Sequence, residues 1–264
     1  MKRTFVAMLS LVLCLGLCGC ATNLYRKYYK DGTKGVDPFK AGLAVIPTAD
    51  PEIINGGADQ KADVMKMKEN NYEFLGISSF WAGNTPDEQA IELGKEIHAE
   101  KILLYRDYKD TQSGVIPITL PNTQTTTTMG MIGSTNVSAQ STTYGSKTDY
   151  LPYSVDRYNY LASFWVKRTA PLVLGLMWKD LTDELRKQIG SNKGVVVTGV
   201  IKNTPAFNAD FFVNDIIKKI DDFEVVDTKG LSDLLNTVNG KKVTITFLRD
   251  GKELTKEVQT NAKP

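Results

Sequence analysis

The stretch NTPAFNADFFVNDII, residues 203–217, lies between two β-forming runs and decides the fold of the last third of this chain. Upstream, the run GVVVT (residues 194–198) is rich in β-branched side chains and predicts a strand. Downstream, the run VTITFLRDGKEL (residues 243–254) alternates apolar and polar residues before Asp250-Gly251, a dipeptide typical of a tight hairpin turn. Together the three stretches predict a β-rich C-terminal domain.

Further features extend this series in both directions. The tripeptide LGL at residues 174–176 precedes a strand, residues 221–225 (DDFEV) form a turn, and Asp227 is a suitable N-cap for a helix. In this order the features resemble a PDZ domain of the bacterial periplasmic-protease type, over residues 170–260. The resemblance implies a PDZ-like β-sandwich or barrel with two helices.

The resemblance also implies a site where a peptide adds to the edge of a sheet. Backbone N–H groups of Gly175 and Leu176 would bind the peptide's terminal carboxylate, and the strand after them would pair with its backbone. By the family's register Leu231 faces the groove, whereas Leu235 fits the groove and the core equally well. The peptide-binding residues implied are Leu174, Gly175, Leu176, Met177, Trp178, Leu231, Leu234 and Leu235.

Two residues depart from the family's pattern. Asp210 and Asn214 stand where such domains often have glycine. Asp and Asn are the residues other than glycine that best tolerate a positive φ, so we expect the fold to accept both.

Residues 51–168 predict a separate α/β domain, which makes the whole chain α+β. A helix is expected over residues 59–70 and a strand over residues 72–80. Thr85 then resembles an N-cap, with Pro86 at the first helical position and Glu88 closing a capping box. The resulting helix leads into a strand over residues 101–108, so we expect a βαβ unit with parallel strands. A last strand, residues 158–167, carries aromatic residues on both faces and closes the domain.

Residues 111–149 form a Thr/Ser-rich insertion in this domain. A structureless loop of that length is unusual inside a compact domain. A long exposed β-hairpin and a partly mobile flap both fit the composition, and the hairpin is favoured. Its arms are expected at residues 115–120 and 150–153, where Pro117 and Pro152 suit edge positions.

The first residues have the pattern of a secretory leader. Lys2 and Arg3 are followed by an apolar run, and residues 17–20 (LCGC) resemble a lipobox that ends in the acceptor Cys20. This resemblance to bacterial lipoproteins implies a signal peptide over residues 1–19 and a covalent lipid at Cys20. The mature chain would then keep a single cysteine, so no Cys-based zinc site is expected, and no motif points to another cofactor or metal. Residues 20–50 are then expected to be a lipidated, solvated tether.

The lipid implies a membrane as the first partner of the protein. Two or more acyl chains anchor a protein durably, whereas one chain binds only marginally. Position 21 is Ala rather than Asp, which by similarity to lipoprotein sorting favours the outer membrane, facing the periplasm, in a double-membraned host. Without residues 1–19 the chain has 30 basic and 30 acidic residues, so its composition predicts no nucleic-acid partner.

Catalysis is not expected from the sequence. His98 is the only histidine, and it lies at the end of a predicted helix, where it fits a cap residue. A Ser-His-Asp site requires a histidine oriented by an acid and close to a serine. No Gly-x-Ser-Gly-Gly stretch accompanies His98, and no phosphate-binding loop is present.

The sequence therefore predicts a lipid-anchored adaptor of the cell envelope that binds C-terminal or extended peptide segments through its PDZ-like domain. Two alternatives stay open at this point. One is a PDZ-bearing peptidase, or the regulatory subunit of one. The other is a structural envelope lipoprotein whose PDZ fold binds nothing.

The lipobox generates a first prediction. Replacing the acceptor thiol by a hydroxyl in Cys20→Ser removes the nucleophile that takes up the lipid, so the variant should leave the membrane fraction or keep its leader. The measurement is incorporation of labelled palmitate together with membrane fractionation. Equal labelling of the wild type and Cys20→Ser would place any anchor elsewhere.

Overall fold

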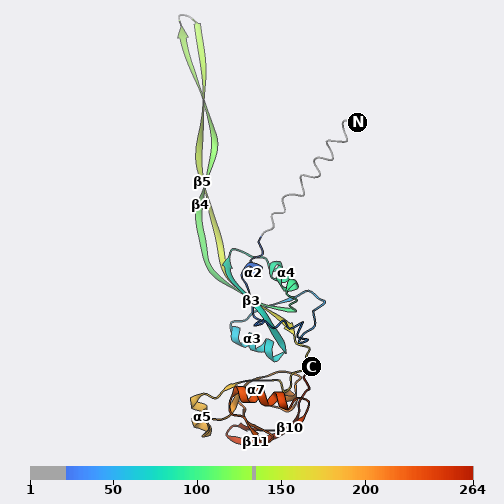
Figure 1. Ribbon diagram of the computed structural model, residues 1–264. Coiled ribbons are helices and arrows are strands. Elements are labelled where there is room, and N and C mark those ends of the chain that lie inside the picture. Colours follow the sequence, from blue (N-terminus) through green and yellow to red (C-terminus); the bar gives the residue numbers. More distant parts are fainter. Residues whose placement is uncertain (1–21, 133–134, 264) are drawn as a thin grey trace, which may run out of the picture. The chain divides into compact units, whose positions relative to one another are not determined.

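The computed structural model describes residues 22–132 and 135–263 (Figure 1). Cys20 and the leader lie outside the described residues. Contacts divide the chain into two compact units. The first contains the described residues up to Phe80, residues 86–105 and those from Tyr160 onward; the second contains residues 81–85 and 106–159.

The N-terminal half of the first unit is built on a five-stranded sheet of order β1-β3-β5-β4-β2. Its strands are β1 (Tyr29–Asp31), β2 (Glu52–Asn55), β3 (Tyr72–Ala82), β4 (Lys101–Ile132) and β5 (Thr135–Lys167). The strand closing the domain is aromatic and buried as expected, since Tyr160, Phe164 and Trp165 are almost fully covered.

Helices cover both faces of this sheet, as successive residues of β4 show. Leu103 packs in a cluster with Met67 of α3 (Gln60–Glu69). Ile102 faces the other way, toward Gly94 of α4 (Glu88–Glu96), where a Cβ on the glycine would lie 3.0 Å from it. Alternation along a strand therefore gives each helix its own face.

The predicted start of the second helix is wrong by two residues. Asp87, not Thr85, is the N-cap of α4, and its side chain makes no capping bond. Thr85 is buried, and its hydroxyl donates to the carbonyl of Gly83 at 3.2 Å. The first helix matches its prediction, because Asp59 caps α3 by accepting from the N–H groups of Lys61 and Ala62.

The expected βαβ unit is only partly correct. Strand, helix and strand follow one another as β3, α4 and β4, but β5 lies between β3 and β4 in the sheet. The parallel pair observed is instead β2 with β4, in which Glu52 faces Lys101. The hairpin partner of β4 occupies the position that the simple unit would give to β3.

The expectation of a solvated tether is wrong for residues 23–31. The short helix α2 (Leu24–Lys27) contacts α4, and β1 pairs antiparallel with β3. Tyr25 is 0% exposed and packs edge-on against Phe80, while its carbonyl accepts from the Ser78 hydroxyl at 2.7 Å. Burial of the Tyr25 side chain therefore helps to hold residues 23–31 against the domain, where β1 forms an edge strand of the sheet.

The Thr/Ser-rich insertion forms the hairpin that was favoured, and this hairpin is the second unit. β4 and β5 continue as a two-stranded ribbon to Ile132 and from Thr135 (Figure 1). Both strands are far longer than the two arms expected from the sequence. Thr favours strands, and the prolines at 117 and 152 do not interrupt either one.

The C-terminal domain contains a six-stranded sheet of order β11-β10-β8-β7-β6, with β9 paired to β8. The strands are β6 (Leu176–Asp180), β7 (Val195–Val200), β8 (Ile216–Ile220), β9 (Phe223–Glu224), β10 (Lys242–Arg249) and β11 (Lys252–Gln259). Three helices accompany them, α5 (Asp183–Ile189), α6 (Pro205–Asn208) and α7 (Thr228–Thr237). The sequence patterns did not indicate α5.

Local sequence features of this domain adopt the geometry expected of them. Asp227 caps α7 by accepting from Gly230 N–H at 2.7 Å. Asp210 and Asn214 have φ values of 52° and 75°, the conformation that glycine would otherwise supply. Asp250 and Gly251 also have positive φ and join β10 to β11, as a primed turn requires.

A buried ion pair ties the central stretch to the closing hairpin. The side chain of Asp215 is 1% exposed, and Arg249 donates to its two oxygens from Nε and Nη2, each at 2.7 Å. The same carboxylate accepts from Phe212 N–H at 2.8 Å, and it raises the pKa of Arg249 through hydrogen bonding.

None of the helices described by the structure is long and apolar enough to cross a membrane.

The ion pair of Asp215 and Arg249 generates a second prediction. Arg249→Met leaves the Asp215 carboxylate buried without its cation, which should lower the free energy of unfolding by about 3 kcal/mol. The matched control is Lys242→Met, whose exposed pair with Glu257 should contribute less than about 1 kcal/mol. Chemical denaturation followed by circular dichroism measures both. Equal losses in the two variants would contradict the role given to Asp215.

Candidate functional site

A groove runs between β6 and α7 in the C-terminal domain. β6 is the last strand of its sheet, so its outer edge has no neighbouring strand among the described residues. The groove has a volume of about 470 Å³. Its lining residues are Ala41, Leu43, Arg168, Pro171, Leu172, Val173, Leu174, Gly175, Leu176, Trp178, Ser232, Leu235, Asn236 and Lys263.

The loop before β6 depends on Gly175. Its φ is +83°, and a Cβ at this position would lie 2.2 Å from Oγ1 of Thr204. Ile201 N–H donates to the carbonyl of Gly175 at 2.9 Å, and Ala206 N–H donates to that of Leu174 at 2.8 Å. The loop takes part in both bonds through its carbonyl groups. These two bonds therefore leave the N–H groups of the loop unused.

The far end of the groove is closed by contacts between β6 and the start of α7. The indole N–H of Trp178 donates to the carbonyl of Thr228 at 3.4 Å. The carboxylate of Asp180 accepts from Thr228 N–H at 2.8 Å. These contacts hold the strand and the helix together, so a ligand would lie between the Gly175 loop and Trp178.

The structure brings part of the implied peptide-binding set to the groove. Leu174, Gly175, Leu176, Trp178 and Leu235 line it. Leu231 is corrected to the core, because it is 0% exposed and clusters with core residues of the sheet. Leu234 packs against that core from the side, and Met177 is half-buried outside the lining.

Helix geometry explains the position of Leu231. Residues three and four apart share a face of a helix, so Ser232, Leu235 and Asn236 present one stripe to the groove. Leu231 and Leu235 are also four apart, but Leu231 is covered completely where α7 lies on the sheet. The leucine pattern alone could not separate the groove wall from the core.

Other lining residues come from distant parts of the chain, and sequence patterns missed them. Ala41 and Leu43 belong to the segment expected to be a tether. Arg168 pairs with Glu73 and donates from Nε to the carbonyl of Ala170, and the ammonium of Lys263 contacts Oδ1 of Asn236. The groove therefore has cationic groups in its walls, which favours an anionic ligand.

His98 lies away from this groove, in the first sheet domain. It follows α4 with φ of 57°, and its ring packs edge-on against Phe39 with 5.5 Å between ring centres. The groove itself is lined by backbone, apolar, amide, hydroxyl and cationic groups. Such an arrangement can bind a carboxylate and an extended chain.

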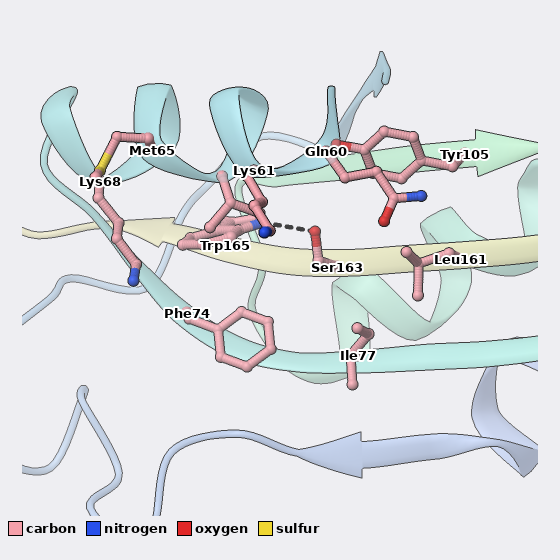
Figure 2. A pocket seen from close by; sticks show the side chains of 11 residues that line it. Gln60, Lys61, Met65, Lys68, Phe74, Ile77, Tyr105, Leu161, Ser163 and Trp165 are labelled. Atoms are coloured by element: carbon pink, nitrogen blue, oxygen red, sulfur yellow. Dashed lines mark hydrogen bonds between the residues drawn. The ribbon is translucent and has the colours of Figure 1, made fainter. Parts of the chain in front are cut away.

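A second cavity, of about 570 Å³, lies between α3 and the sheet of the first domain. Figure 2 shows Lys61, Met65 and Lys68 on the helix, with Trp165 and Leu161 among the side chains of the strands below. Neither lysine forms an ion pair among the described residues. The cavity can accommodate an apolar group, and it offers polar atoms mainly at the helix.

Tyr105 forms one end of this second cavity. Burial raises its pKa to about 12, and the hydrogen bond that its hydroxyl donates to Asp63 at 3.0 Å acts in the same direction. A phenol in this state stays neutral at physiological pH. Its role in the described structure is to fasten α3 to β4.

Residues 173–260 match the protein family described as PDZ domain, and this match makes the last third of the chain a PDZ domain. No curated protein matches the chain.

Among solved structures, the chain is similar to the HtrA-type protease AlgW with a decapeptide, at 25% identity and a TM-score of 0.31, over 39% of this chain and 37% of that one. It is also similar to the HtrA3 PDZ domain bound to a phage-derived ligand (FGRWV), at 20% identity and a TM-score of 0.30, over 33% of this chain and 83% of that one. The chain therefore spans well under half the length of the AlgW protease.

The loop geometry generates a third prediction. Gly175→Ala should lower the free energy of unfolding by about 1 kcal/mol for the left-handed conformation, and by a further ~1–3 kcal/mol for the overlap with Thr204. Gly190→Ala is the matched control, since Gly190 has φ of +63° and nothing within 4 Å of its Cβ position. Denaturant titration measures both. A loss at Gly175 no larger than at Gly190 would contradict the close packing of the loop.

Proposed function

We propose that this protein is a lipid-anchored adaptor of the cell envelope that binds C-terminal or extended peptide segments of other envelope proteins. The observation that carries the proposal is the groove beside the unpaired edge of β6, with the Gly175 loop at one end. Such an edge adds an incoming peptide as a further strand, so backbone groups supply affinity and side-chain pockets supply specificity.

The chemistry of the groove favours a particular ligand end. Leu174, Leu176 and Leu235 offer an apolar surface for a last side chain. Backbone N–H groups of the Gly175 loop would bind a terminal carboxylate. Charge-assisted bonds of this type are stronger than neutral ones, and the cations in the groove walls add a favourable field.

Anchoring is the second element of the proposal. It rests on the lipobox ending in Cys20 and on the short distance in sequence from Cys20 to α2. A tether of two residues before the N-cap Asn23 would keep the first domain close to the lipid surface. In a double-membraned host that surface would be the periplasmic side of the outer membrane.

Binding without catalysis is the third element. The groove lining offers no histidine or carboxylate that could act as a general base. The peptidase alternative therefore gains no support from the groove, and an adaptor role needs only reversible binding. Recovery of uncut peptide after incubation with the purified protein distinguishes the two functions.

The carboxylate generates a fourth prediction. A peptide with an apolar last residue and a free carboxylate should bind at micromolar strength, about −8 kcal/mol. Amidation of that end removes bonds worth roughly 1.5–3 kcal/mol, so affinity should fall at least tenfold. Fluorescence anisotropy measures both peptides. If free and amidated peptides bind alike, or if the peptide is cleaved, the proposed function is wrong.

The same prediction can be tested by changing the protein instead of the peptide, with a double variant that exchanges two neighbouring residues of α7. Ser232 lines the groove, whereas the neighbouring Asp233 is exposed outside its lining. Exchanging them, as Ser232→Asp with Asp233→Ser, moves one carboxylate into the groove at constant net charge. Repulsion of the ligand carboxylate should weaken binding by at least about tenfold, or ~1.4 kcal/mol, with an unchanged circular dichroism spectrum.

A further inference from the structure

The hairpin contains a long uncharged segment that peptide binding does not explain. The 36 residues from Thr111 to Ser146 include no Asp, Glu, Lys, Arg or His, in a chain with 23% charged residues. Fifteen of the 36 are Thr or Ser. A polar but wholly uncharged segment of this length is a feature of the sequence that calls for a physical reason.

Among the described residues, both outer edges of the hairpin are unpaired over most of its length. The other neighbour of β4 is β2, which pairs only with residues 101–104. The other neighbour of β5 is β3, which has 11 residues against the 33 of β5. A two-stranded ribbon is marginally stable by itself in water, so this one needs a further partner along its edges.

The base and the outer part of the hairpin differ in how their edges are protected. From the base to the middle of the hairpin, Pro117, Pro121 and Pro152 lack N–H donors, and Lys147 and Asp149 add charge. Natural proteins use both devices to prevent pairing at a strand edge. Residues 122–146 contain neither a proline nor a charge. The outer part is therefore the portion of the ribbon that is open to pairing.

Apolar side chains in the outer part are also uncovered. Met129 is 81% exposed and Met131 is 70% exposed. Residues two apart in a strand point to the same face, so these methionines form one apolar stripe on β4. Exposure of this extent fits a surface that is covered in the working state.

We propose that residues 122–132 and 135–146 pair edge to edge with the same residues of a second copy of this chain. A copy brings an equally neutral edge, so no charge repulsion opposes the contact. A second copy fits the open edge better than a lipid surface does, because lipid offers no partners to the N–H and C=O groups of that edge.

The pairing has a simple geometry. When two hairpins lie side by side in the same direction, β5 of one copy meets β4 of the other in antiparallel orientation. This inference does not depend on peptide binding, because it concerns no residue of the groove.

The test is the oligomeric state of the full-length protein in a mild detergent, measured by size-exclusion chromatography with light scattering. Thr126→Lys with Thr127→Lys places a cation on each face of the outer part, at two exposed positions. The matched control, Gln112→Lys with Ser113→Lys, adds the same charge at two adjacent exposed positions of β4 near the base. We expect multiples of one chain for the wild type and the control, and single chains for the outer variant.

Hydrogen exchange provides a second measurement that needs no substitution. In a lone ribbon every other amide of each strand points outward and exchanges fast, whereas edge pairing protects both sets. Amides of residues 122–132 and 135–146 should therefore gain protection as the protein concentration rises. A monomeric wild type, identical masses for the two Lys variants, or concentration-independent exchange would overturn the proposal. Binding of a monomer to phosphatidylglycerol vesicles through the hairpin would assign the surface to lipid instead.

Discussion

Backbone groups at the edges of sheets must find hydrogen-bond partners, and this requirement organises the whole protein. In the first domain β1 and β2 are the two outer strands, and each is only three or four residues long. Short edge strands offer little backbone for unwanted pairing. The outer edges of β6 and of the long hairpin belong to longer strands, and both proposals concern these two edges.

The β6 edge is kept available by its surroundings. Trp178 and Asp180 fasten the end of the strand to Thr228, at the start of α7, which separates strand and helix by a fixed gap. At the other end, Gly175 adopts a conformation that its contact with Thr204 allows only in the absence of a Cβ. The groove is thus formed by the packing of the domain before any ligand arrives, and preorganisation of this kind reduces the entropy lost on binding.

The two edges differ in what they select. The β6 edge lies beside apolar and cationic groups, so it discriminates by the end and the charge of a peptide. Along residues 122–146 the hairpin carries no charge, so pairing there depends on backbone bonds and on shape. A neutral ribbon also lacks the charged residues that normally prevent strand edges from pairing. The proposed partner for this edge is a second copy of the chain.

Local patterns in the sequence determined several elements of the PDZ domain and favoured the hairpin. The cap at Asp227 and the turn at Asp250-Gly251 each depend on residues a few positions apart, so the sequence predicted them. The positive φ of Asp210 and Asn214 was implied by the resemblance to PDZ domains. Contacts between distant residues decided the rest. Tyr25 is part of the core because it packs against Phe80 and its carbonyl accepts from Ser78. β5 lies between β3 and β4 because it is the hairpin partner of β4. Likewise, α7 turned Leu231 inward and Ser232 toward the groove, and Arg168 and Lys263 joined the groove from distant positions. Such outcomes depend on which surfaces meet when the sheets and helices pack, and a pattern read along one strand or one helix carries no information about its future neighbours.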